Sequence, residues 1–282
     1  MPTPLPQTTL PAPAWHAPLL IRGSVACHVG AAVTVAPHPE LWPWALGAIA
    51  VNHAVLTVAG LTPRCDWLGE NLRRLPDASV SRHEIALTFD DGPNPQVTPA
   101  VLDLLDAAAA KATFFCIAQR ARQQPGLCRE IVQRGHSVQN HSDRHGLGFA
   151  LSSLGGFARE VNNAQATLTE ITGQAPLFFR APAGLRNPFL GPVLVRNRLR
   201  LVSWTRRGFD TVQRRPQRVF ERLACNLAAG DILVLHDGNC ARSRSGESVV
   251  LETLPLLLQR IAQQNLRCVT LAQAFRAGPA AC

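Results

Sequence analysis

From about Ser79 onward, short apolar runs alternate with longer segments that are apolar on one side only. The short runs predict buried strands at 85–89, 112–117, 135–140, 176–179, 199–204, 231–235 and 267–271. The one-sided segments predict helices at 98–110, 156–172, 218–229 and 249–264. Strands that alternate with helices indicate parallel β/α units, in an open sheet or a closed barrel. Such folds collect their chemistry at the carboxyl ends of the strands.

The first part of the chain instead contains two apolar stretches separated by a short polar turn. Residues 23–37 are short for a membrane span, which needs about 20 apolar residues, whereas 41–61 is long enough and has no formal charge. Trp42 and Trp44 suit a membrane interface. We interpret the region as one membrane helix or a two-helix hairpin that turns around 38–40. A soluble helical layer packed on the main domain is the less favoured alternative.

Arginines flank this apolar region but are missing from its turn. Arg22 precedes the first stretch, Arg64, Arg73 and Arg74 follow the second, and the connecting loop has no lysine or arginine. The positive-inside rule then predicts that both ends of a hairpin, and the main domain, lie in the cytoplasm. A single span would change that orientation. No basic region followed directly by an apolar core, as in a standard signal peptide, is visible.

The chain is strongly basic, with 28 lysines and arginines against 19 acidic residues and a net charge of +9. Lys111 is the only lysine, and no recognition helix, zinc-finger spacing or aromatic–basic interleaving accompanies the scattered arginines. We therefore expect no nucleic-acid partner. The densest arginines lie at 196–200 and 206–218, which favours attraction to anionic lipid or to an anionic sugar carrier.

Eight cysteines are spread along the chain without any C-x-x-C pair, so no zinc-ribbon or thioredoxin-like motif is present. An even number would suit four disulfides in a secreted protein. Several of them lie singly in apolar runs, as Cys116 does after Phe114 and Phe115. We therefore favour single buried thiols over a disulfide framework.

The first predicted strand of the main domain ends in Asp90 and Asp91, followed by Gly92-Pro93. Adjacent carboxylates point in different directions, so one can bind a metal while the other handles a proton. The Gly-Pro pair forces a sharp turn. A helix cap or an Asx turn is an equally simple interpretation of this segment taken alone.

A pair of histidines, His141 and His145, follows another predicted strand end. Histidines four residues apart share one face of a helix, where both imidazoles can reach one cation. We therefore predict a helix here. Together with Asp91, the pair would make a two-histidine, one-carboxylate site with open positions for water and substrate.

Five motifs, in order, give residues 79–275 a resemblance to a known family. They are Thr88-Phe89-Asp90-Asp91-Gly92-Pro93, His141 to His145, Arg180-Ala181-Pro182-Ala183-Gly184, Trp204 with Asp210, and Leu233-Val234-Leu235-His236-Asp237. The chain resembles the polysaccharide deacetylases of carbohydrate esterase family 4, the NodB homology domain. The resemblance implies a deformed (β/α) barrel, here preceded by an apolar N-terminal helical segment. We accordingly divide the chain into a membrane-associated segment (1–78), a catalytic domain (79–276) and a tail (277–282).

The resemblance also implies a metal and a base. Asp91, His141 and His145 would hold a divalent ion, expected to be zinc, which lowers the pKa of its bound water. Asp90 would be the general base that takes a proton from the attacking water. Arg180 would pair with Asp90 and hold it ionised and oriented.

An acid and an oxyanion donor follow from the same resemblance. His236 would protonate the departing amine, and Asp210 would raise the pKa of His236 so that it starts protonated. The backbone N–H of Ala183 would stabilise the oxyanion. The small pocket for the acyl methyl would be walled by Trp204, Leu233 and Leu235.

The expected function is hydrolysis of an N-acyl group, most often acetyl, from an amino sugar. The substrate would be a polysaccharide or a lipid-linked glycan at a bacterial inner membrane, with the cytoplasmic face favoured. Two departures from the family pattern bear on the substrate: Arg206-Arg207-Gly208-Phe209 replaces an acidic, tryptophan-containing segment, and Ala183 replaces an aromatic residue. The alternatives are a non-catalytic carbohydrate-binding relative and a metal-dependent phosphoesterase.

Overall fold

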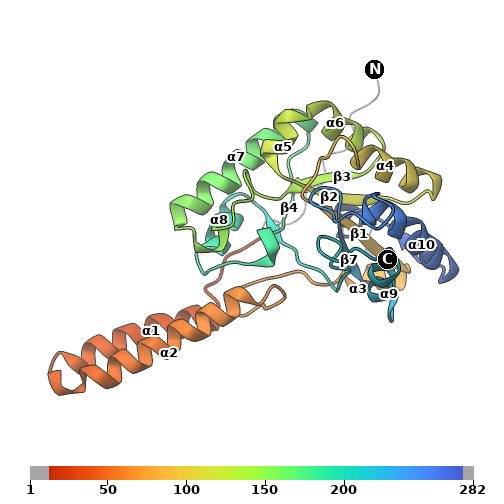
Figure 1. Ribbon diagram of the computed structural model, residues 1–282. Helices are drawn as coiled ribbons and strands as arrows, with labels where there is room; N and C mark the ends of the chain where they lie inside the picture. The colour runs from red at the N-terminus through yellow and green to blue at the C-terminus, as the bar shows by residue number, and fades with distance from the viewer. Residues whose placement is uncertain (1–12, 276–282) are drawn as a thin grey trace, which may run out of the picture.

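The computed structural model describes residues 13–275, which form a helical hairpin and an α/β domain (Figure 1). The strands are β1 (Glu84–Asp90), β2 (Ala112–Cys116), β3 (Ser137–Asn140), β4 (Phe178–Phe179), β5 (Arg200–Leu201), β6 (Arg206–Arg207), β7 (Ile232–His236) and β8 (Arg267–Cys268). They are hydrogen-bonded in the order β5-β4-β3-β2-β1-β7-β6, and β8 pairs with the start of β1. All of these strand pairs are parallel, which confirms the predicted β/α organisation.

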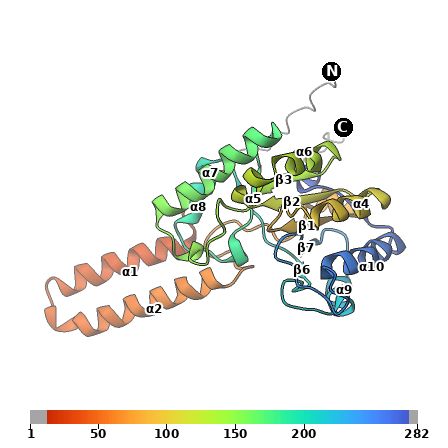
Figure 2. The same ribbon diagram turned by 45° about the horizontal axis from the view of Figure 1, so that its top comes forward.

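The domain's helices lie around this sheet (Figure 2). They are α3 (Asp77–Ser81), α4 (Thr98–Ala107), α5 (Ala118–Gln123), α6 (Pro125–Gln133), α7 (Leu154–Thr172), α8 (Leu190–Arg196), α9 (Pro216–Ala224), α10 (Val249–Gln263) and α11 (Leu271–Ala274), with 3₁₀ turns η2 (Phe149–Leu151) and η3 (Pro182–Gly184). The four predicted helices correspond to α4, α7, α9 and α10. Helices α5, α6 and α8 were not predicted; they have six, nine and seven residues, and α5 and α8 span two turns or fewer, too short to show a helical repeat.

Strand alternation gives the sheet one apolar face and one face that becomes polar at its carboxyl end. In β1, Ile85, Leu87 and Phe89 belong to the main hydrophobic cluster, which also contains buried residues of α4, α9 and α10. Thr88 and Asp90 point the other way, since side chains alternate along a strand. Both are nevertheless buried. The fold thereby creates a polar interior where the strands end.

Helices α1 (Leu19–Val35) and α2 (Trp42–Leu61) form the hairpin and project away from the domain (Figures 1 and 2). No residue of α1 is buried, and only Ala59 and Gly60 of α2 are. Polar side chains of the two helices contact each other: Asn52 Nδ2 of α2 donates to Ser24 Oγ of α1 at 3.0 Å. The hairpin therefore does not form a layer packed on the main domain, which was the alternative to a membrane element.

The segment after the hairpin belongs structurally to the domain. Arg186 donates its backbone N–H to Gly60 O at 3.1 Å, and its buried guanidinium bonds the carbonyl of Cys65 at 2.8 Å. Leu72 then forms a parallel bridge with Val202 beyond the sheet edge. The base of the hairpin is thus fixed to the loop that follows η3.

Seven cysteines lie within residues 13–275, and none of these seven is in a disulfide. Cys116, Cys128 and Cys268 are buried, whereas Cys225 is exposed. Buried thiols therefore account for only part of the set, and the thiols of Cys116 and Cys128 are neighbours rather than single. The eighth cysteine of the sequence, Cys282, lies outside the described residues.

Candidate active site

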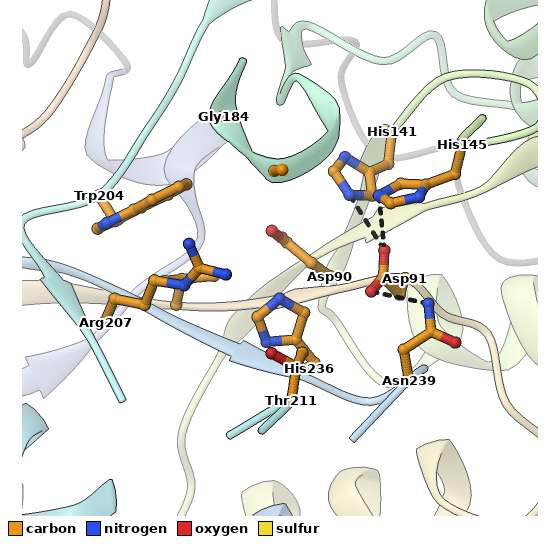
Figure 3. Close-up of a pocket in the computed structure, with 12 residues that line it drawn as sticks. Asp90, Asp91, His141, His145, Gly184, Trp204, Arg207, Thr211, His236 and Asn239 are labelled. Carbon is orange, nitrogen blue, oxygen red and sulfur yellow. Dashed lines mark hydrogen bonds and ion pairs between the residues drawn. The ribbon is translucent and has the colours of Figure 1, made fainter. Parts of the chain in front are cut away.

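A pocket opens where the strands end, and it gathers most of the polar residues that the motifs single out (Figure 3). Its lining residues are Asp90, Asp91, His141, His145, Ala183, Gly184, Trp204, Arg207, Thr211, Val234, His236 and Asn239. They come from β1, β6, β7 and the loops that follow β1, β3, β4, β5, β6 and β7. Residues more than a hundred positions apart in the sequence thus share one cavity.

Three side chains converge as ligands of a divalent cation would. Asp91 Oδ1 lies 3.3 Å from His141 Nε2 and 3.2 Å from His145 Nε2. The three ligand atoms all lie within 4.8 Å of one another. Asp91 Oδ1 is buried and accepts no hydrogen bond from any described residue. A buried carboxylate oxygen facing two imidazole nitrogens is a fitting donor set for zinc.

The histidine pair is not on a helix, contrary to the prediction from its spacing. His141 to His145 form an irregular loop after β3, in which Ser142 and His145 have φ values of 66° and 55°. Asn140 Oδ1 accepts the Ser142 N–H at 3.0 Å, and Ser142 Oγ accepts the His145 N–H at 3.0 Å. Because these side chains satisfy the backbone locally, the loop brings both rings to one point without helical geometry.

Surrounding groups orient the proposed ligands. Asn239 Nδ2 donates to Asp91 Oδ2 at 3.0 Å, which leaves Oδ1 free for a cation. Arg120 bridges the two residues by donating to Asp91 O at 2.7 Å and to Asn239 Oδ1 at 2.8 Å. His141 Nδ1 bonds Arg180 O at 2.8 Å, and this sets the tautomer that exposes the Nε2 lone pair.

Electrostatics suit the same assignment. Burial alone raises the pKa of Asp91, but the close approach of His141 and the charges of the histidines outweigh it and hold that pKa well below its usual range. Burial lowers the pKa of His145, which keeps this imidazole neutral and available as a ligand near pH 7. Burial also lowers the pKa of His141, but the charges of Asp90 and Asp91 outweigh it and raise that pKa. The site therefore presents an ionised carboxylate beside a neutral His145, and His141 must give up its proton when a cation binds.

Asp90 lines the pocket and is held from behind by a buried arginine. Arg180 Nη1 lies 2.7 Å from Asp90 Oδ1 and also donates to Thr88 Oγ1 at 2.7 Å. Its Nη2 donates to Ser203 O at 2.8 Å, and the guanidinium lies over the Phe115 ring at 4.1 Å from the centroid. These contacts fix Asp90 as an oriented carboxylate, which is the geometry a general base needs.

His236 and Asp210 form a second charged pair in the pocket. His236 Nδ1 lies 2.8 Å from Asp210 Oδ1, and the His236 backbone N–H donates to Asp210 Oδ2 at 2.7 Å. Burial lowers the pKa of His236, but the charge and hydrogen bond of Asp210 outweigh it and raise the pKa to about 9. His236 is therefore protonated near neutral pH and can deliver a proton into the cavity.

The remaining predicted residues divide into those that reach the pocket and those that do not. Ala183, with φ 55°, and Trp204 both line it. Leu233 and Leu235 are not brought to the pocket, because they face the main hydrophobic cluster on the other side of β7. Val234 lines the cavity in their place. A one-residue error in strand phase moves a side chain to the opposite face.

Three further lining residues lie outside the five motifs. Arg207, Thr211 and Asn239 carry no recognisable ligand spacing of their own. Asn239 follows His236-Asp237 by two positions, which is the nearest the sequence comes to a signal. Only the fold places its amide against Asp91.

Comparison with known proteins agrees with this geometry. A family model described as polysaccharide deacetylase matches residues 77–201. The chain is 31% identical over 194 residues to a peptidoglycan-N-acetylglucosamine deacetylase of Bacillus cereus, a match that covers 68% of this chain and 88% of the relative. The chain belongs to the polysaccharide deacetylase family. The chain is also 35% identical over 161 residues to a chitooligosaccharide deacetylase of Azorhizobium caulinodans, covering 56% of this chain and 75% of that one.

Solved structures share the fold of this chain. A peptidoglycan N-acetylglucosamine deacetylase superposes with a TM-score of 0.66 at 23% identity, covering 74% of this chain and 94% of the other. A family 4 pseudoenzyme from Bacillus anthracis superposes with a TM-score of 0.65 at 17% identity, covering 73% and 69%. The predicted NodB-type β/α fold is thereby confirmed. Since a pseudoenzyme has the same fold, the site residues rather than the fold must argue for catalysis.

Proposed function

We propose that this protein is a metal-dependent hydrolase that removes an N-acetyl group from an amino sugar. The observation that carries the proposal is the orphaned Asp91 Oδ1, buried between His141 Nε2 and His145 Nε2. Zinc held there would polarise the amide carbonyl and acidify the attacking water. A non-catalytic relative would have no use for the oriented acid–base pairs that line the same pocket.

The chain's own residues divide the proton transfers. Asp90, held by Arg180, accepts the proton of the water whose oxygen adds to the amide carbon. Ala183 lines the pocket, and its backbone N–H donates to the resulting oxyanion. His236 then gives its proton to the nitrogen as the carbon–nitrogen bond breaks. The first products are acetic acid and the free amine. Acetic acid then loses its proton to solvent and leaves as acetate, while Asp90 releases its proton to solvent and His236 regains one, so both residues return to their starting states.

The hairpin supports a membrane location for this chemistry. Residues Pro39–Leu61 have a mean hydropathy of 1.6 and enough length to cross a membrane. The 20 residues of α2 extend about 30 Å, close to the thickness of a bilayer's hydrocarbon core. Its large apolar side chains are exposed, among them Val51 at 65% and Val58 at 61%. In water such a surface would be costly, whereas lipid would cover it.

The membrane element also adjoins the pocket, which favours a lipid-linked sugar over a distant polymer as substrate. Pro63 follows α2 and packs against Gly184, a lining residue: a side chain on Gly184 would meet Pro63 Cβ at 2.6 Å and Trp204 at 2.8 Å. The hairpin thus ends at the rim of the site. The arginine pattern of the sequence supports a catalytic domain on the cytoplasmic side of a bacterial inner membrane.

The test is acetate release by purified full-length protein in lipid nanodiscs. Substrates are chitin oligomers, peptidoglycan fragments and a lipid-linked N-acetylated sugar, each assayed after chelation and after zinc is restored. We expect release that requires zinc, is lost in Asp90→Asn, and is fastest with the lipid-linked sugar. Zinc binding measured in Asp90→Asn separates a lost base from a lost fold. Release that persists in Asp90→Asn would contradict the assigned base, and preference for a polymer would contradict the substrate.

A further inference from the structure

We propose that Arg207 determines substrate specificity by binding an anionic oxygen group, phosphate or carboxylate, carried by the N-acylated sugar. This inference rests on the deacetylase function proposed above and names a property of its substrate. It starts from the position of Arg207 in the catalytic pocket and from the absence of an acidic partner for it among the described residues.

Arg207 is held at the pocket wall by the sheet. It lies in β6, paired in register with Val234 of β7, and both residues line the cavity. Figure 3 shows its guanidinium lying between Trp204 and the acid–base residues Asp90 and His236. A substrate whose amide reaches those two residues therefore passes within reach of this cation.

Within residues 13–275 the Arg207 side chain makes no hydrogen bond and no ion pair, and its Nε atom is buried without a partner. It lies 5.1 Å from the Trp204 ring centroid and 5.0 Å from that of Phe209. Aromatic rings hold a guanidinium in place through cation–π contact, but they do not replace hydrogen-bond acceptors for its N–H groups. The neighbouring Arg206 is different, because it bonds Asp231 and the carbonyls of Cys225 and Asn226. Arg206 is thus a structural residue, whereas Arg207 has its donors free.

The charges of the pocket leave Arg207 unbalanced. Asp90 is paired with Arg180, His236 is paired with Asp210, and Asp91 faces the two histidines. Arg207 is also close enough to Arg180 that, after burial, its charge contributes to lowering the pKa of that guanidinium. A neutral sugar would leave this repulsion in place, whereas an anionic group would offset it.

The shape of guanidinium selects the ligand. Its planar fork binds two oxygens of a phosphate or carboxylate at once, which lysine cannot do. Such a group has two sources: the phosphate that joins a sugar to a lipid carrier, or an acid within a glycan. Either one, borne by the sugar that carries the amide or by its neighbour, would dock on Arg207 while the amide meets the catalytic residues.

The experiment compares acetate release from three matched sugars: a neutral methyl glycoside of N-acetylglucosamine, its 1-phosphate ester, and a disaccharide in which a uronate is the neighbour. We expect wild-type kcat/KM to be highest for an anionic substrate. Arg207→Gln should lower the anionic-to-neutral ratio of kcat/KM about 10- to 100-fold, and Arg207→Lys should lower it less. The anionic substrate whose kcat/KM falls most in Arg207→Gln, the phosphate ester or the uronate disaccharide, identifies the source of the anion.

Arg218→Gln is the matched control, because Arg218 is exposed on α9 and does not line the pocket. It removes the same charge and should leave the ratio unchanged. Equal losses for neutral and anionic sugars in Arg207→Gln would overturn the inference. If wild type releases acetate from none of the sugars, the proposed function fails instead. Calorimetric binding of the phosphate ester still tests Arg207 then: affinity equal in wild type and the variants would overturn the inference without reference to turnover.

Discussion

The two oxygens of Asp91 have separate tasks, and Asn239 is what separates them. Its amide occupies Oδ2, so Oδ1 is left to face the histidines. We predict that Asn239→Ala weakens zinc binding about 10- to 100-fold, since the carboxylate can then rotate out of position. Competition with a chromophoric chelator measures the affinity.

The control for this variant removes an asparagine amide elsewhere. Asn197 donates to Asn162 Oδ1 at 2.8 Å and is not among the pocket residues. Asn197→Ala should bind zinc as wild type does. Zinc affinity unchanged in Asn239→Ala would show that Asp91 needs no such support.

The pairing of His236 with Asp210 predicts a pH dependence. Asp210 raises the pKa of His236 against the effect of burial, so the acid stays protonated through neutral pH. Activity should fall as pH rises through that pKa, because His236 then has no proton to donate. Asp210→Asn removes the charge and lowers the pKa, which moves the descending limb of kcat/KM to lower pH by about 1 to 3 units. Any charge of a bound ion acts on both proteins alike, so the direction of the shift stands.

The profile of kcat/KM against pH in the two proteins makes this measurement. A purely structural role for Asp210 would reduce activity by the same factor at every pH. An alkaline limb that stays where it is in wild type would therefore exclude the electrostatic role.

At the scale of single elements, the sequence was informative where burial is continuous. Strand β1 is buried at all seven positions, and its apolar run is visible without the structure. The motifs likewise singled out Asp90, Asp91, His141 and His145 as a set. Short elements were harder to predict, because α5 has six residues and carries little periodic signal. The helix expected at the histidine pair is absent, because side-chain hydrogen bonds to the local backbone stabilise a loop there. The spacing of the histidines gives no sign of these bonds.

The hairpin is apolar in sequence and exposed in the fold, and these two properties together favour an apolar environment around it. Val51 is exposed in the middle of α2, where the proposed membrane location would cover it with lipid. We predict that Val51→Arg weakens membrane association, because an arginine at the centre of a span costs about 2.5 to 3.5 kcal/mol. The fraction of protein that resists carbonate extraction from membranes measures it.

The same substitution on the domain provides the comparison. Val212 is 74% exposed and lies outside the hairpin, so Val212→Arg should leave extraction unchanged. Both variants should keep the same rate on a soluble sugar in detergent. Identical extraction of Val51→Arg and wild type would favour a hairpin that meets a protein partner rather than lipid.

At the scale of the whole molecule, the main surprise is that hairpin and pocket adjoin. Apolar patterning suggested a boundary at residue 78, yet Leu75 belongs to a core cluster of the catalytic domain and Leu72 is bridged to Val202. No sequence pattern within 62–76 predicts these contacts, because they depend on partners more than a hundred positions away. The hairpin and the α/β domain are therefore joined by a packed segment rather than by a free linker, which constrains how the pocket faces a membrane.

That constraint makes the side of the membrane a testable property of the whole chain. The arginine pattern predicts a catalytic domain in the cytoplasm. Cys225 is exposed on this domain, so a membrane-impermeant maleimide can report which side it occupies. In a Cys282→Ser background, we predict that intact spheroplasts leave Cys225 unlabelled and that permeabilised ones label it. Cys225→Ser measures labelling at the half-buried thiols. Labelling of Cys225 in intact spheroplasts would place the catalytic domain outside the inner membrane, and a lipid-linked substrate would then have to present its sugar on that outer face.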